Sequence, residues 1–131
     1  MLRLTALIFA ALLTLSGCAP ATEGEKTVNY VSISQDEAAR LMEDGGDLVI
    51  LDVRRTDEFA QGHIPGAICI PNETIGTDPV PGLENKDQLI LVYCRSGRRS
   101  KEAAQKLADM GYTNVKEFGG IITWQGEITV G

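Results

Sequence analysis

Short apolar segments alternate with amphipathic ones from residue 31 onward, and this alternation predicts the elements of the fold. Residues 48–51 and 89–93 are apolar at every position, which is typical of central parallel strands covered by helices on both faces. Shorter strand-like segments lie at residues 31–33, 67–70 and 114–118. Strands that alternate with helices in this way indicate an α/β sandwich with a mainly parallel sheet.

Helical signals lie between these strands. Ser34 precedes a segment whose apolar residues recur on one side, so it predicts a helix cap. A short helix is expected around residues 57–60. A longer helix is expected over residues 101–110, with Ser100 as its cap and Gly111 directly after its end.

The first seventeen residues have a different character. Arg3 is the only charged side chain before an apolar run at residues 4–15, and small residues follow that run. This order is typical of a cleaved secretory signal. An uncleaved membrane anchor is the alternative, although the run is short for a bilayer core of about 30 Å.

Leu15-Ser16-Gly17-Cys18 resembles the bacterial lipobox, which implies that Cys18 carries lipid and becomes the new amino terminus. The residues that follow are small and polar, as in a flexible tether. The expected organisation is a lipoprotein signal at residues 1–17, a lipidated cysteine and tether at 18–29, and one domain at 30–131.

The charge of the chain is acidic, with 12 Lys and Arg against 18 Asp and Glu and a formal net charge of −6. Such a balance argues against nucleic acid or an anionic bilayer surface as the partner. Arg95, Arg98 and Arg99 nevertheless gather in one short stretch. A local positive cluster in an acidic chain indicates a small anionic ligand.

Cys94 lies in the same stretch, on the expected turn between a strand and a helix. Backbone N–H groups at a helix amino terminus favour an anion, and neighbouring arginines add positive charge. Such a setting lowers a thiol pKa from its free value of about 8.5, so Cys94 is a candidate nucleophile that the loop presents. The alternative is a buried cysteine that only packs.

The remaining thiol and the single histidine give weaker signals. Cys69 lies in a strand-like run and is interpreted as a core residue, with a resolving thiol for Cys94 as the alternative. There is no C-x-x-C motif, and His63 is the only histidine. The sequence therefore gives no support for a zinc site or a dithiol motif, and we expect neither metal nor cofactor.

Five short motifs, in order across residues 31–124, resemble the single-domain rhodanese, or thiosulfate sulfurtransferase-like, family. They are Leu51-Asp52-Val53-Arg54, Glu58-Phe59, Gly62-His63-Ile64-Pro65-Gly66-Ala67, Tyr93-Cys94-Arg95-Ser96-Gly97-Arg98-Arg99-Ser100, and Gly119-Gly120-Ile121 through Trp124. Two features depart from the usual pattern, namely Cys69 and the short polar segment after Trp124.

The resemblance implies a three-layer sandwich in which Cys94 accepts a sulfane sulfur and holds it as a persulfide. The donor would be a small anion such as thiosulfate, the acceptor cyanide or a thiol, and the protein a monomer. The loop would direct its backbone N–H groups at the sulfur. The loop residues concerned are Arg95, Ser96, Gly97, Arg98 and Arg99.

Three matching residues are interpreted as structural support. Asp52 is expected to accept backbone hydrogen bonds, and Arg54 to pair with Glu58 or Asp57. His63 is expected to be buried and bonded to backbone, with catalysis by its imidazole as the alternative.

Two rival functions remain at this stage. Cysteine-dependent phosphatases and arsenate reductases of similar fold place an arginine where this chain has Ser100. The second rival is a rhodanese-like module that relays sulfur between proteins or binds a partner without turning over thiosulfate.

We expect Cys18→Ala to release the protein from the membrane fraction, because the lipid on Cys18 would be its anchor. Ala19 rather than aspartate follows this cysteine, which implies sorting to the periplasmic side of the outer membrane if the source has two membranes. Fractionation of the cell envelope followed by immunoblotting checks this. Cys18→Ala protein that stayed in the membrane fraction would support the uncleaved anchor.

Overall fold

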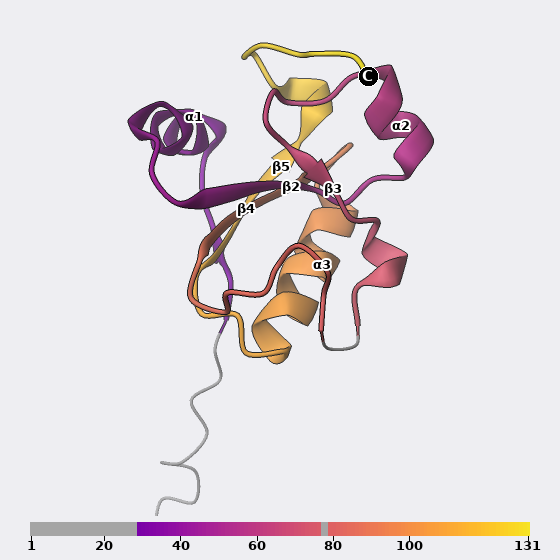
Figure 1. The fold of residues 1–131 in the computed structure, drawn as a ribbon. Coiled ribbons are helices and arrows are strands. Elements are labelled where there is room, and N and C mark those ends of the chain that lie inside the picture. Colours follow the sequence, from indigo (N-terminus) through magenta and orange to yellow (C-terminus); the bar gives the residue numbers. More distant parts are fainter. Residues whose placement is uncertain (1–28, 77–78) are drawn as a thin grey trace, which may run out of the picture.

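A five-stranded parallel sheet forms the centre of the domain in a computed structural model, which describes residues 29–76 and 79–131 (Figure 1). The strand order is β1-β5-β4-β2-β3, and every pairing between these strands is parallel. The expected signal, Cys18 and nearly all of the expected tether lie outside the described residues. The strands are β1 (Val31–Ser32), β2 (Leu48–Asp52), β3 (Ile68–Cys69), β4 (Leu89–Cys94) and β5 (Val115–Gly120).

Helices cover both faces of this sheet, and Figure 1 shows α1 and α3 on opposite sides of it. The helices are α1 (Gln35–Asp44), α2 (Thr56–Gln61) and α3 (Arg98–Asp109), with 3-10 turns at Asn72–Thr74 and Ile121–Thr123. The predicted α/β sandwich with a parallel sheet is confirmed. Among the described residues, no helix combines the length and apolar character needed to cross a membrane.

Side-chain alternation along β4 divides the core in two. Successive residues of a strand point to opposite faces, so Val92 and Cys94 join the cluster beneath α3. Leu91 and Tyr93 join the cluster that includes Ala38 of α1. The candidate nucleophile therefore lies on the α3 face of the sheet.

The segment between β3 and β4 is more than the polar loop that its composition indicates. Ile75, Val80 and Leu83 are each no more than 3% exposed and belong to the core cluster under α3. The Tyr112 hydroxyl donates to the Leu83 carbonyl oxygen. These apolar residues follow neither a helical nor a strand period, so the sequence did not indicate that they are buried. Tertiary contacts alone bury them.

The start of α3 corrects one prediction. The helix begins at Arg98, directly after Gly97, whose φ of 107° is in the left-handed region that favours glycine. Ser100 is therefore inside the first turn and is not the cap. Ser34, in contrast, caps α1 as predicted, since its side chain accepts the Glu37 N–H.

Candidate active site

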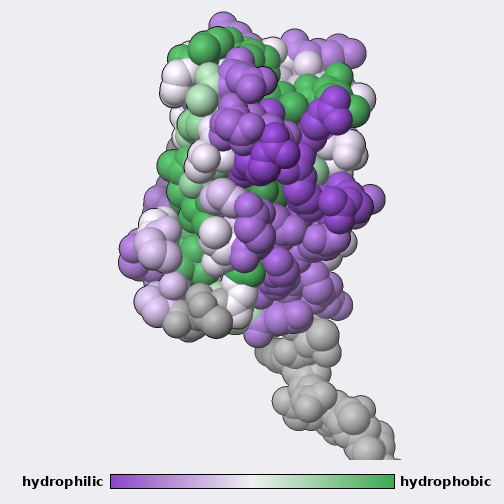
Figure 2. Space-filling model, turned by 90° about the vertical axis from the view of Figure 1, so that its right-hand side faces the viewer, coloured by the Kyte–Doolittle hydropathy of each residue, from purple (hydrophilic) through white to green (hydrophobic). Residues whose placement is uncertain are grey.

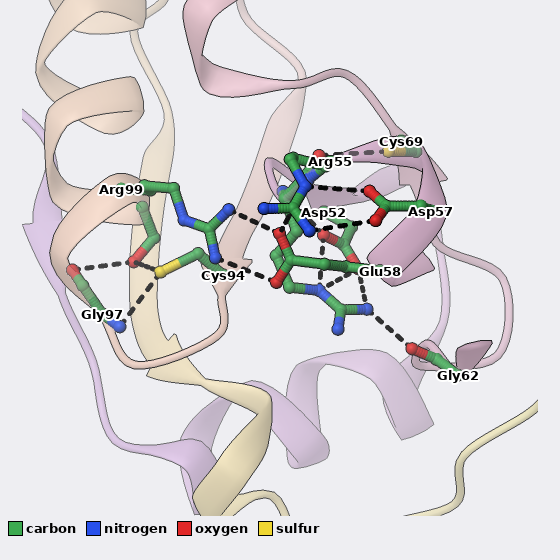
Figure 3. A network of polar contacts seen from close by, with 11 residues as sticks. Asp52, Arg55, Asp57, Glu58, Gly62, Cys69, Cys94, Gly97 and Arg99 are labelled. Atoms are coloured by element: carbon green, nitrogen blue, oxygen red, sulfur yellow. Dashed lines mark hydrogen bonds and ion pairs between the residues drawn. The ribbon is translucent and has the colours of Figure 1, made fainter. Parts of the chain in front are cut away.

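Cys94 ends β4, and the three residues after it form the loop that leads into α3. The Gly97 N–H donates to Cys94 Sγ at 3.0 Å, and Ser100 Oγ lies 3.4 Å from the same sulfur. Figure 3 shows the Gly97 contact. The sulfur therefore lies within a turn of chain that offers it a backbone donor, as expected for a site that holds an anion.

The thiol is enclosed rather than presented, which corrects the prediction from sequence. Cys94 is only 1% exposed, because the loop and the first turn of α3 cover it. Burial alone does not make Cys94 a packing residue, because its sulfur accepts the Gly97 N–H.

The loop rests directly on the backbone of β5. A Cβ placed on Gly120 would lie 2.0 Å from the Arg95 carbonyl oxygen and 2.6 Å from Ser96 Cα. Gly120 has a φ of −129°, which any residue can adopt. The glycine is therefore required for space and not for backbone conformation.

Three of the arginines around the loop already have acidic partners. Arg99 makes two hydrogen bonds to Glu58, at 2.7 and 3.1 Å, and these bonds lower the pKa of Glu58 to about 2 against the effect of burial. Arg98 pairs with Glu102 across one turn of α3. Outside the loop, Arg55 pairs with Asp57, and Figure 3 shows this pair and the Arg99–Glu58 pair.

Arg95 differs from these arginines. Within the described ranges its side chain forms no hydrogen bond or ion pair, and it lines the mouth of a pocket of about 820 Å³. The pocket also contains Ser96, Arg98 and Arg99. Four of the five predicted loop residues thus line one opening, and Gly97 and Cys94 are not part of its lining. Arg95 has an unengaged charge there.

The pairing predicted for Arg54 is wrong. Arg54 binds Asp52 through its guanidinium, at 2.8 to 3.1 Å, and donates to the Gly62 carbonyl oxygen at 2.6 Å. Glu58 instead goes to Arg99. Arg54 lies two residues after Asp52, which is fully buried at the end of β2, and its guanidinium compensates that buried charge. Asp52 also accepts the Arg54 backbone N–H, as expected.

His63 and Cys69 lie outside the loop. His63 is 6% exposed, with Nδ1 2.9 Å from the Phe59 carbonyl oxygen and its ring stacked on Phe59 at 3.7 Å. The sequence predicted that the His63 imidazole is buried and hydrogen-bonded to the backbone. Cys69 Sγ lies 3.5 Å from the Arg54 carbonyl oxygen, and burial raises the pKa of this thiol to about 11. A thiol that stays protonated at neutral pH favours packing over a resolving role.

Glu117 is a site residue that sequence reasoning missed. It is 2% exposed on β5, and Ser100 Oγ donates to its Oε1 at 2.8 Å. Glu117 shares the α3 face with Val115, two residues earlier. An acidic residue in register with a buried valine was a signal in the sequence, because side chains two apart in a strand share a face.

Comparisons with known proteins found similar sequences and folds. The model of the family described as Rhodanese-like domain matches residues 34–127. The chain is 37% identical over 71 residues to thiosulfate sulfurtransferase PspE of Escherichia coli K12, a match that covers 54% of this chain and 68% of that protein. It is also 37% identical over 94 residues to a sulfurtransferase of Allochromatium vinosum, covering 70% and 85% of the two chains.

A carrier protein and solved structures are also similar. The putative sulfur carrier protein YrkF of Bacillus subtilis is 31% identical over 105 residues, which cover 79% of this chain and 55% of that protein. The structure described as a rhodanese with anions from E. coli has a TM-score of 0.59 at 32% identity, covering 64% of this chain and 99% of that chain. The structure of thiosulfate sulfurtransferase from Pseudomonas aeruginosa has a TM-score of 0.69 at 27% identity, and the match covers 78% of this chain and 20% of that chain.

We expect Gly120→Ala to lower the free energy of unfolding by about 1–3 kcal/mol and to displace the loop, because the new methyl group overlaps the Arg95 carbonyl. Urea denaturation followed by circular dichroism measures the change. Gly76→Ala is the matched control, since a Cβ there has nothing within 4 Å. Equal denaturation midpoints for the two variants would contradict the close packing of the loop on β5.

Proposed function

Because the chain belongs to the Rhodanese-like domain family, we propose that it moves a sulfane sulfur from thiosulfate or a related donor to a thiophilic acceptor through a persulfide on Cys94. The observation that supports this most is the Gly97 N–H aimed at Cys94 Sγ at 3.0 Å. A persulfide is an anion, and donors that are already oriented stabilise it without reorganisation.

The proposed reaction has two displacement steps. The Cys94 thiolate attacks the outer sulfur of thiosulfate, a new S–S bond forms, and the original S–S bond breaks as its electron pair leaves with sulfite. An acceptor thiolate or cyanide then attacks the terminal sulfur and returns Cys94 to a thiolate. Arg95 at the pocket mouth binds the anionic donor, because its charge has no partner among the described residues.

The loop geometry supports sulfur transfer over phosphoryl or arsenate chemistry. A tetrahedral oxyanion needs an arginine that is free to close around its oxygens. Position 100 holds a serine, and Arg99 is bound by both oxygens of Glu58. We therefore propose no role for the site as a phosphatase.

A sulfur relay to a protein partner is the second candidate. Ile122 and Ile128 are 63% and 47% exposed and both line the pocket. They belong to the C-terminal segment at the top of Figure 1, and Figure 2 shows apolar surface at the same end of the molecule. An apolar wall beside a cationic mouth suits an acceptor larger than cyanide.

For the location of the protein, we propose the cell envelope. Lipid on Cys18 would hold the domain outside the cytoplasm, with residues 19–29 as the tether. The sequence pattern at residues 1–18 supports this proposal. Several acyl chains on one cysteine would give stable attachment, whereas a single chain would give a marginal one.

Incubation with thiosulfate should add the mass of one sulfur atom to Cys94, and Cys94→Ser should abolish both the mass gain and the transfer of sulfur to cyanide. The reason is that the persulfide needs the Cys94 thiolate. Mass spectrometry of the intact protein and of the Cys94 peptide measures the first effect, and a thiocyanate assay the second.

Cys69→Ala serves as the matched control and should keep the activity of the parent protein. An aryl phosphate tested in parallel should be turned over negligibly. Efficient phosphate hydrolysis without any gain of sulfur would show that the proposed chemistry is wrong. A protein persulfide that forms but is not discharged by cyanide would support the relay instead.

Arg95→Ala should raise KM for thiosulfate about tenfold, the equivalent of one lost charge-assisted hydrogen bond worth about 1.5 kcal/mol. Arg98→Ala should raise KM less, because Arg98 is occupied by Glu102. Steady-state kinetics at constant ionic strength compares the two variants. A larger effect at Arg98 would contradict the assignment of Arg95 as the donor-binding arginine.

A further inference from the structure

Glu117 is a buried carboxylate with no cation beside it. None of the ion pairs in the part of the chain that the structure describes involves this residue. Its hydrogen bonds come from the Gly119 N–H at 2.7 Å, from Ser100 Oγ at 2.8 Å and from Ser32 Oγ at 3.3 Å. The partners that the structure gives this buried carboxylate are therefore neutral donors.

Ser100 connects this carboxylate to the candidate nucleophile. Its Oγ lies 2.8 Å from Glu117 Oε1 and 3.4 Å from Cys94 Sγ. The Gly97 and Gly119 carbonyl oxygens lie 3.0 and 3.4 Å from Ser100 Oγ. A hydroxyl has one proton to donate, and Glu117 Oε1 is the nearest acceptor. The remaining lone pairs of Oγ then face the sulfur.

The other titratable and charged groups around Cys94 do not offer such a link. Arg99 approaches from α3 and is bound to Glu58 of α2. His63 directs Nδ1 at Phe59. The Asp52–Arg54 pair belongs to the opposite face of the sheet, since Leu51 and Val53 on either side of Asp52 face α3.

Among the described residues, the other neighbours of Glu117 on this face of the sheet are uncharged. Ser32 of β1 contacts it from one side, and Val92 of β4 is its partner in the sheet register. The sheet-facing residues of α3 are Ala103, Ala104 and Leu107. Cys94 is therefore the titratable group to which the hydrogen bonds of Glu117 lead.

We propose that Glu117 accepts the thiol proton of Cys94 through Ser100. The thiol proton passes to Ser100 Oγ while the Ser100 hydroxyl proton passes to Glu117 Oε1. The pair changes from thiol and carboxylate to thiolate and carboxylic acid, with no proton gained or lost and no change in oxidation state. This proposal rests on the proposed function, for which it supplies the base that generates the attacking thiolate.

The polarity of the hydrogen bonds reverses in this step. Before the transfer Cys94 donates to Ser100, which donates to Glu117. After it Glu117 donates to Ser100, which donates to the thiolate, and the Gly97 N–H continues to donate to Sγ. The thiolate therefore has two donors without the loop having to open to water, which suits a sulfur that is 1% exposed.

Titration of the thiolate tests this proposal without thiosulfate. Two groups that share a proton titrate in two macroscopic steps, so the thiolate signal should rise, reach a plateau and rise again with pH. The height of the plateau is the share of the proton that lies on Glu117. The ultraviolet absorbance of the full chain minus that of Cys94→Ser isolates this signal, because Cys69 and the tyrosines cancel.

Glu117→Gln should convert the two steps to one. Glutamine keeps the shape of the side chain and an oxygen that accepts from Gly119 and Ser100, so a purely structural role would survive the substitution. The signal is again the difference between this variant and its Cys94→Ser form. Ser100→Ala, which breaks the link while retaining the carboxylate, is the second variant and should also give one step.

Ser32→Ala is the matched control. It removes the bond to the other oxygen of Glu117 and should leave both steps in place. A single step in the parent protein, superimposable on that of Glu117→Gln, would overturn the proposal. Two steps in a protein that gains no sulfur from thiosulfate would support the proton transfer from Cys94 to Glu117 and refute the proposed function. One step in a protein with normal sulfur transfer would support the proposed function and refute the proton transfer.

Discussion

The contact between the Cys94 loop and the backbone of Gly120 is the constraint on which the arrangement of the site depends. The loop can curve around the sulfur only if its outer side lies flat against β5, and the space there excludes even a methyl group. The Arg95 carbonyl oxygen accepts the Ile122 N–H just beyond that strand. The nucleophile, its backbone donor and the wall of the pocket are thereby fixed relative to one another.

Charge in the site is arranged in two layers with different partners. Around the opening, arginines pair with carboxylates, and the half-buried pair of Arg99 and Glu58 joins α3 to α2. Beneath the loop, the donors that Glu117 has among the described residues are all neutral. The exposed pairs, Arg55–Asp57 and Arg98–Glu102, contribute about 0–1 kcal/mol each, so they affect the orientation of the arginines more than the stability. Arg95, without such a pair, keeps its charge for a ligand.

The sequence predicted the fold class and the position of Cys94 because both depend on local patterns. Apolar runs define strands, and a cysteine between a strand and a helix lies at the carboxyl edge of the sheet whatever the remaining details. The partner of Arg54, the burial of Cys94 and the packing of Ile75, Val80 and Leu83 were not predictable in the same way. Each depends on which segments meet across the sheet, and residues close in sequence, such as Arg54 and Asp57, can face different neighbours.

The position of Glu117 in the sheet opposes the stability of the fold to the proposed activation of the Cys94 thiol. Its neighbours on the same face, Val92 and Val115, show what the core would accept there. An apolar side chain in place of a buried, uncompensated carboxylate often stabilises a protein. Selection for stability alone would therefore remove the acid at this position. An acid at this position therefore costs folding free energy beside Ser100, the residue that links it to Cys94.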